Sequence, residues 1–290
     1  MAEWFNAPVL KTDEGESPPR VRIPEPPPVP QNKYHMIPVS SLEWHVSHNC
    51  NFACSGCSDF SNYKHDIRIT AETLETWYAP WHTRIVPKTV ALVGGEPLLN
   101  KDIENIILSA RRYWQHSDLE LVTNGWLLYK YPNLPAILND TNTTLYVSKH
   151  YNSVEYNDKF DSIVDYLEQQ QIKYKIYRND KTWFEIYKPT LLPHEDNDPE
   201  SSWHNCPTYQ DCFQLYDGAI WKCPPVAYIN LMSKKYKLDP KWDTYLKYKA
   251  LQPDCTDKQI VEFFNRGAEF VCGMCPAKLK LTKKEVEWQN

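Results

Sequence analysis

The segment that decides the fold of this chain is a short loop that reads Ser47-His48-Asn49-Cys50-Asn51-Phe52-Ala53-Cys54-Ser55-Gly56-Cys57. It places three cysteines, Cys50, Cys54 and Cys57, close together in the sequence. Three thiolates can hold an iron-sulfur cluster by three corners and leave one iron open for a reactant, as catalytic metal sites leave one position open. A structural zinc loop is the alternative interpretation, because intracellular cysteine groups also bind zinc.

Two glycine-containing turns follow this loop, and each comes after a strand-like stretch. The first stretch runs from Thr89 into Gly94-Gly95-Glu96-Pro97, where missing side chains would let a ligand lie against the backbone. The second starts at Leu119 and ends in Thr123-Asn124-Gly125. The cysteine loop and these two turns, in this order, resemble the radical S-adenosylmethionine (SAM) superfamily over roughly residues 40–190.

The resemblance implies a cofactor set and a group of site residues. A 4Fe-4S cluster held by Cys50, Cys54 and Cys57 would bind SAM and cleave it to methionine and a 5′-deoxyadenosyl radical, after reduction by a donor such as flavodoxin or ferredoxin. Gly56 stands where the family usually has an aromatic residue beside the adenine, so Phe52 or Phe60 would supply the apolar wall. The residues expected to contact SAM are Gly56, Gly94, Gly95, Glu96, Thr123, Asn124, Ser148 and Arg178.

Strand-like and helix-like periods alternate from Ser41 onward. Strands are expected at residues 42–47, 144–148, 172–177 and 183–187, and helices at 158–170 and after a possible Asn100 cap. This alternation implies parallel strands joined by right-handed crossovers. The predicted fold class is α/β, a partial (β/α)6 radical SAM barrel with ligand loops at the strand carboxyl ends.

A second group of cysteines follows the polar run at residues 194–202. The Asp217-Gly218 turn predicts a β-hairpin that places Cys212 across from Cys223. Farther on, Cys272-Gly273-Met274-Cys275 has a two-residue spacing suited to one metal or cluster.

This arrangement resembles the auxiliary-cluster module called twitch, a shortened form of the SPASM module. The resemblance implies a second 4Fe-4S cluster held by Cys206, Cys223, Cys272 and Cys275. Cys212 remains a rival to Cys206, because the hairpin holds it beside Cys223. A four-cysteine zinc knot is the structural alternative, since zinc takes the same ligands.

Cys255 precedes the capping box Thr256-Asp257-Lys258-Gln259. A thiol just outside a helix amino terminus feels the positive end of the helix, which raises its acidity and its reactivity. The alternative is that Cys255 packs on Ile260 as a hydrophobic staple. Cys255 and Cys212 are the two candidate catalytic thiols.

Composition bounds the class of protein. The chain has 290 residues, a net charge of −5 and nine cysteines. No apolar run approaches the ~18 residues of a membrane span, and the amino terminus lacks a signal-peptide pattern. We therefore expect a cytoplasmic protein that uses cysteines for metal or redox chemistry rather than disulfides, and nucleic acid is not an expected partner.

Three segments are predicted along the chain. Residues 1–36 form a flexible proline-rich arm, because their prolines remove backbone donors and fix extended dihedral angles. Residues 37–193 form the radical SAM partial barrel, and residues 194–290 form the auxiliary 4Fe-4S domain.

The predicted activity is hydrogen abstraction from a small polar substrate, such as a sugar or nucleotide derivative. A fully cysteine-ligated auxiliary cluster would relay an electron, which favours net oxidation. A thiol at Cys255 or Cys212 would instead return a hydrogen atom and epimerise the substrate. Peptide modification is a third outcome, disfavoured because the tail before residue 37 is too short for a leader-peptide-binding domain. A non-catalytic iron-sulfur or zinc interaction protein is the alternative from another class, and it predicts no SAM cleavage.

Overall fold

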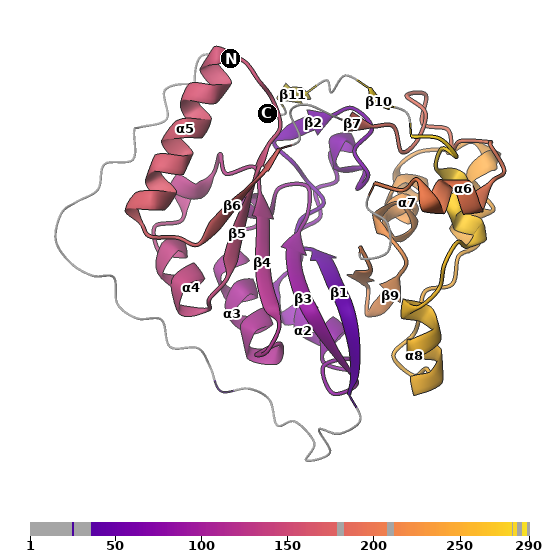
Figure 1. The fold of residues 1–290 in the computed structure, drawn as a ribbon, viewed down its shortest axis with the longest axis horizontal. Coiled ribbons are helices and arrows are strands. Elements are labelled where there is room, and N and C mark those ends of the chain that lie inside the picture. The colour runs from indigo at the N-terminus through magenta and orange to yellow at the C-terminus, as the bar shows by residue number, and fades with distance from the viewer. Residues whose placement is uncertain are drawn as a thin grey trace.

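The computed structural model describes residues 25, 36–178, 183–207, 212–279, 281–282 and 286–288. The predicted proline-rich arm lies outside these residues except for Glu25 and Met36. Figure 1 shows a central twisted sheet with helices packed against one face. The cysteine-rich carboxyl-terminal segment lies beside the edge of the sheet that β1 forms. No helix in the described ranges combines the length and apolarity that crossing a membrane requires.

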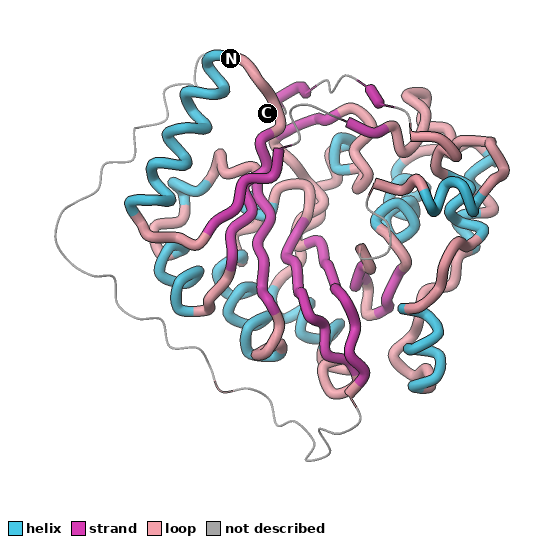
Figure 2. Tube along the Cα trace, in the orientation of Figure 1, coloured by secondary structure: helices cyan, strands magenta, loops and turns pink. Residues whose placement is uncertain are grey.

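The centre of the fold is a parallel sheet (Figures 1 and 2). Its parallel strands follow the order β6-β5-β4-β3-β1, so each strand after β1 adds on the same side of the previous one. With right-handed crossovers this order places the connecting helices on one face. The strands are β1 (Ile37–His45), β3 (Ile85–Val93), β4 (Asp118–Thr123), β5 (Thr144–Lys149) and β6 (Tyr174–Arg178).

Four helices connect these strands, namely α2 (Ala71–Tyr78), α3 (Ile103–Tyr113), α4 (Leu134–Asp140) and α5 (Val154–Gln169). The alternation of strands and helices confirms the predicted mostly parallel α/β fold. The described residues supply five parallel barrel strands, and the position beside β1 is taken by β8 (Gln214–Tyr216) from the later cysteine-rich segment.

The two faces of β1 differ in polarity because strand side chains alternate. Leu42 and Trp44 are fully buried, and the Trp44 ring lies 5.6 Å from the Tyr78 ring of α2. Glu43 and His45 point to the opposite face, where they line a cavity. The helix-covered face of the sheet is therefore its apolar core, and the inner face is left for a ligand.

Two sequence expectations need correction. The helix after Asn100 begins at Ile103 with Asp102 as its N-cap residue, whereas the buried Asn100 side chain donates to the carbonyl oxygens of Val46 (2.7 Å) and Ile69 (2.8 Å). Asn100 therefore ties β1 to the segment before α2 instead of capping a helix.

The strand expected at residues 183–187 is only β7 (Trp183–Phe184), and it pairs with β10 (Leu281–Thr282) outside the main sheet. Tyr187 of that stretch is buried and stacks on Phe60, with ring centroids 5.1 Å apart. Its apolar character thus reflects packing on Phe60, just after the cysteine loop, rather than strand pairing.

The predicted hairpin is present as β8 and β9 (Ala219–Trp221). Asp217 and Gly218 both have positive φ angles, 53° and 76°, as a two-residue turn of this type requires. Because β8 pairs with β1, this later segment continues the main sheet, and a domain boundary near residue 193 stays a prediction.

The remaining elements surround the sheet edge and the cysteine loop. They are β2 (Phe52–Cys54), β11 (Val286–Trp288), α6 (Pro199–His204), α7 (Pro224–Lys235) and α8 (Asp257–Phe264), with short 3-10 helices at Ser61–Tyr63, Pro97–Leu99, Leu128–Lys130, Pro240–Trp242, Tyr245–Lys247 and Phe270–Met274. Strand β2, inside the cysteine loop, pairs with β11.

Candidate active site

A cavity of about 640 Å³ opens at the carboxyl ends of the parallel strands. Most of the site residues expected from the sequence meet in its wall. These are Cys50, Cys54, Gly56, Cys57, Gly94, Gly95, Thr123, Asn124, Ser148 and Cys212. Phe52 also lines the cavity, and Phe60 packs on Tyr187 behind it.

The three thiols of the cysteine loop share one environment. Burial raises the pKa of Cys50 well above its usual value, and the charges of Glu96, Cys54 and Cys57 add to the shift. Burial, together with Asp59 and Cys54, also raises the pKa of Cys57 to about 12. Buried thiolates this close together repel one another unless a positive metal group shares them. The donor set therefore fits a metal cluster, and iron takes thiolate ligands of this kind.

The glycine pair docks the cysteine loop onto the end of β3. The Gly95 amide donates to the Ser47 carbonyl oxygen (2.8 Å), and the Glu96 amide donates to the Asn49 carbonyl oxygen (2.9 Å). A Cβ atom at Gly95 would lie 2.4 Å from the Asn49 oxygen, and one at Gly94 would lie 2.6 Å from the Ser47 oxygen. The missing side chains therefore make room for the loop backbone, while both glycines still line the cavity.

Gly95→Ala is expected to displace the cysteine loop. Its methyl group would collide with the Asn49 backbone, and overpacking of this kind costs about 1–3 kcal/mol. We expect fewer iron atoms per chain after anaerobic reconstitution and a lower melting temperature. Gly267→Ala is the matched control, because its methyl group would meet nothing closer than Trp203 Nε1 at 3.9 Å. Equal iron content in the two variants would contradict the docking role.

Glu96 joins the two glycine turns. Its buried carboxylate accepts hydrogen bonds from Thr123 Oγ1 (2.6 Å), the Asn124 amide (2.8 Å) and the Leu98 amide (2.9 Å). Burial raises the pKa of Glu96 to about 7, although these three donors oppose the shift. Glu96 is not among the residues that line the cavity, and its carboxylate holds Thr123 and Asn124, which do; its contact with SAM stays a prediction.

The Thr-Asn-Gly turn is also bonded to the cysteine loop, because Asn124 Nδ2 donates to Asn51 Oδ1 (2.8 Å). The cysteine loop and both glycine turns thus form one hydrogen-bonded unit. Ser148 lines the cavity from β5, and the backbone of Arg178 pairs with Lys149 at the end of β6. The side chain of Arg178 lies outside the described part of the structure.

The later cysteines gather around a second, small cavity of about 40 Å³. It is lined by Cys206, Cys212, Cys223, Cys272 and Cys275, together with Lys222 and apolar side chains. Burial raises the pKa of Cys223 and of Cys275 well above the usual value, and the charge of Cys206 acts on both. Five thiols therefore meet here, among them the four predicted auxiliary ligands and their rival Cys212.

Cys212 also lines the main cavity, so it lies between the two sites.

Lys222 lies at the small cavity, where its Nζ is 3.0 Å from Glu269 Oε1 and 4.3 Å from the centre of the Trp203 ring. Across the described residues, no group of three or more His, Cys, Asp or Glu side chains has the arrangement of a single-ion site.

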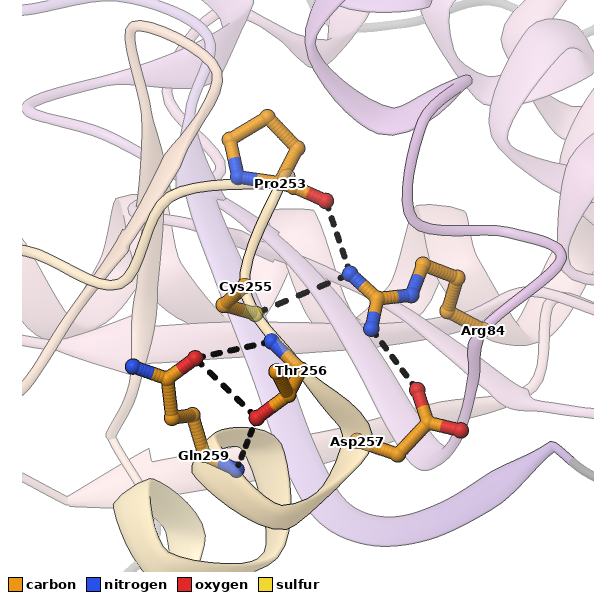
Figure 3. A network of polar contacts seen from close by, with 6 residues as sticks. All are labelled: Arg84, Pro253, Cys255, Thr256, Asp257 and Gln259. Carbon is orange, nitrogen blue, oxygen red and sulfur yellow. Dashed lines mark hydrogen bonds and ion pairs between the residues drawn. The ribbon is translucent and has the colours of Figure 1, made fainter.

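The structure does not bring Cys255 to either described cysteine-lined cavity. Its Sγ lies 3.6 Å from Arg84 Nη1, and the other terminal nitrogen of Arg84, Nη2, donates to Asp257 Oδ1. Figure 3 shows these contacts. Arg84 immediately precedes β3, and the Gly94-Gly95 turn follows the other end of that strand. At ~3.3 Å per residue the two ends are about 30 Å apart. Cys255 packs against the hydrophobic core beside a complete capping box, and its packing on Ile260 as a staple stays a prediction.

Glu43, His45 and Asp59 are among the polar residues of the main cavity that sequence reasoning missed. Burial raises the pKa of Glu43 to about 7 and of Asp59 to about 6, and it lowers the pKa of His45 well below the usual range. Apolar and polar residues alternate in Leu42-Glu43-Trp44-His45, a strand that leads into the cysteine loop. This alternation could have identified Glu43 and His45 from the sequence.

Comparison with known proteins finds similar sequences for part of the chain. No family model matches the chain. GTP 3′,8-cyclase of Staphylococcus saprophyticus is 31% identical over 101 residues, and the probable GTP 3′,8-cyclase of Pyrococcus abyssi is 35% identical over 92 residues. Each match covers 32% of this chain and 29% of the relative, so the chain spans under a third of the length of these curated relatives.

Similar solved structures include Streptococcus suis SuiB bound to S-adenosylmethionine, with 19% identity and a TM-score of 0.40 over 50% of this chain and 36% of SuiB. BtrN in complex with AdoMet and 2-DOIA has 14% identity and a TM-score of 0.47, over 79% of this chain and 82% of BtrN. The sequence similarity to the cyclases accompanies a cysteine loop and two glycine turns that fold into one unit at the carboxyl ends of parallel strands. Together these findings support the resemblance of the chain to the radical SAM superfamily.

Proposed function

We propose that this protein cleaves SAM reductively and uses the resulting radical for net two-electron oxidation of a small polar substrate, with an auxiliary 4Fe-4S cluster as the electron acceptor. The observation that carries the proposal is the position of Cys212 in the walls of both cavities. Pro207 and Pro224 of the same segment also line the main cavity. The later cysteines thus lie directly behind one wall of the space that would hold the substrate.

The cysteine loop would hold the first cluster through Cys50, Cys54 and Cys57. When bound, that cluster supplies the electron that splits SAM into methionine and the 5′-deoxyadenosyl radical. The chain itself orients the reactants: the backbone at Gly94 and Gly95 faces the methionine end, and Phe52 supplies an apolar wall. Thr123 is fixed by Glu96 and Asn124 by Asn51, so their polar groups are positioned before SAM binds.

The auxiliary cluster would be held by Cys206, Cys223, Cys272 and Cys275. With four protein ligands it keeps no open iron, so it would accept an electron rather than bind substrate. An external donor such as flavodoxin or ferredoxin would reduce the first cluster. The direct test of the function is formation of 5′-deoxyadenosine from SAM by anaerobically reconstituted protein with a reductant.

Epimerisation is the second candidate, because the Cys212 thiol lines the main cavity and could return a hydrogen atom. We expect oxidation: in deuterated water the product should be two hydrogens poorer, without deuterium on carbon. Cys212→Ala should then retain turnover unless Cys212 is itself a ligand of the auxiliary cluster. Cys255→Ala, which removes a thiol at the end of β3 opposite the glycine turn, is its matched control. Mass spectrometry of the product reads the outcome. One solvent deuterium in a product of unchanged formula, lost in Cys212→Ala but kept in Cys255→Ala, would establish epimerisation instead.

A further inference from the structure

The main cavity has a polar wall that the SAM chemistry described above does not use. It consists of Glu43 and His45 on β1 and Asp59 just after the cysteine loop. Glu43 and His45 are two residues apart on one strand, so both side chains project from the inner face of the sheet. This wall adjoins Cys212 and Pro224, on the side of the cavity closed by the later cysteine-rich segment.

A neutral hydrogen-bond network holds Glu43 in place. Gln214 Nε2 donates to Glu43 Oε2 and to the Cys212 carbonyl oxygen, both at 2.7 Å. The Tyr228 hydroxyl donates to Gln214 Oε1 at 2.8 Å, and Gln214 itself is fully buried. The amide group of Gln214 is therefore fully used, and it orients the Glu43 carboxylate without neutralising its charge.

The charged neighbours of Glu43 do not neutralise it either. Burial is the largest cause of the raised pKa of Glu43. The nearby charges of Asp59 and Glu120 are both negative, so they raise this pKa further. With a pKa of about 7 the Glu43 carboxyl can take up a proton near neutral pH, and its charged form is costly to bury unless a cation or strong donors compensate it. A cationic group on a bound ligand would meet this need and would form a charge-assisted hydrogen bond.

His45 adds a second unsatisfied group. Its side chain is 2% exposed, and its Nδ1 has no hydrogen-bond partner among the described residues. Its Nε2 lies 3.8 Å from Asp59 Oδ1. Buried polar atoms are almost always paired in folded proteins, so a ligand group or an ordered water would complete the hydrogen bonding of His45.

We propose that Glu43, His45 and Asp59 form the substrate-binding wall of this cavity and that the group they bind is a protonated amine, which makes the substrate a small amine-bearing polar molecule. Glu43 and Asp59 supply the two carboxylates, and His45 bonds a neighbouring hydroxyl or amino group. This inference rests on the proposed function, because the wall would face a substrate only if SAM binds in the same cavity, at Gly94 and Gly95. A phosphate-bearing substrate would face two carboxylates here and would be repelled.

The charge of the substrate can be measured before its identity is known. Small molecules from the native host are separated at pH 7 into fractions retained by a cation exchanger, retained by an anion exchanger and retained by neither. Each fraction, and GTP as a separate compound, is added to reconstituted protein with SAM and reductant, and the rate of 5′-deoxyadenosine formation is compared with that without addition. We expect stimulation by the cation-exchanger fraction alone.

Glu43→Gln removes the charge and keeps the shape of the side chain. Loss of a charge-assisted hydrogen bond should raise the amount of the fraction needed for half-maximal stimulation about 10- to 100-fold. Glu43→Asp keeps the charge and should restore part of the response. Glu155→Gln, on the exposed first turn of α5, is the matched control and should respond like the wild type.

A second measurement does not depend on turnover. Without reductant, the cation-exchanger fraction should raise the melting temperature of the wild type and of Glu155→Gln, but not that of Glu43→Gln. Stimulation by GTP, by the anionic or by the neutral fraction, no response to the cationic fraction, or a full response of Glu43→Gln would overturn the inference. Absence of 5′-deoxyadenosine from every mixture would instead show that the proposed function itself is wrong.

Discussion

Replacing Cys50, Cys54 and Cys57 together by alanine is expected to reduce 5′-deoxyadenosine formation from SAM to the level of a protein-free mixture. These three thiols meet in the wall of the main cavity, and a 4Fe-4S cluster cannot be held there without them. Without that cluster no group in the cavity delivers an electron to the sulfonium. The effect should therefore be complete rather than partial.

The measurement is chromatography of 5′-deoxyadenosine after anaerobic reconstitution with iron, sulfide, SAM and a reductant. Cys255→Ala is the control, because it removes a partly buried thiol at the other end of β3 and should retain the wild-type rate. Circular dichroism of the triple variant separates loss of the cluster from loss of the fold. Product formation that survives the triple replacement would contradict the role of the three cysteines in SAM cleavage.

The second large effect concerns metal content. Two 4Fe-4S clusters bind about eight iron atoms per chain, so the wild type should contain about eight and the triple variant about four. The reciprocal variant, with Cys206, Cys223, Cys272 and Cys275 replaced by alanine, should keep about four and should still cleave SAM. Single replacements of Cys206 and of Cys212 then decide between these rivals, since only the true ligand lowers the iron content.

Elemental analysis by inductively coupled plasma mass spectrometry distinguishes iron from zinc in the same samples. One zinc per chain with about four irons would identify the later cysteines as a structural knot. If the triple variant lost all iron, no auxiliary cluster would exist and the proposed electron acceptor would have to be abandoned.

The amino-acid sequence already contained the local signals of this fold. The three cysteines, the Gly94-Gly95 pair and the Thr123-Asn124-Gly125 turn each predict a ligand loop, because their chemistry depends on residue type and short spacing. The Asp217-Gly218 turn predicts the hairpin for the same reason, since both residues adopt positive φ angles at low cost. These features are local, so neighbouring residues alone reveal them.

Long-range contacts decided the rest. The space that Gly95 leaves for the Asn49 backbone depends on which segments the fold brings together. So do the hydrogen bond from Thr123 to Glu96 and the position of Cys255 beside Arg84, at the end of β3 opposite the glycine turn. The wall formed by Glu43 and His45 also depends on long-range contacts. Alternation along β1 predicts that both side chains share a face, but only the pairing of β1 with β3 and β8 makes that face the inside of a cavity, because burial is a property of the assembled sheet and not of the strand.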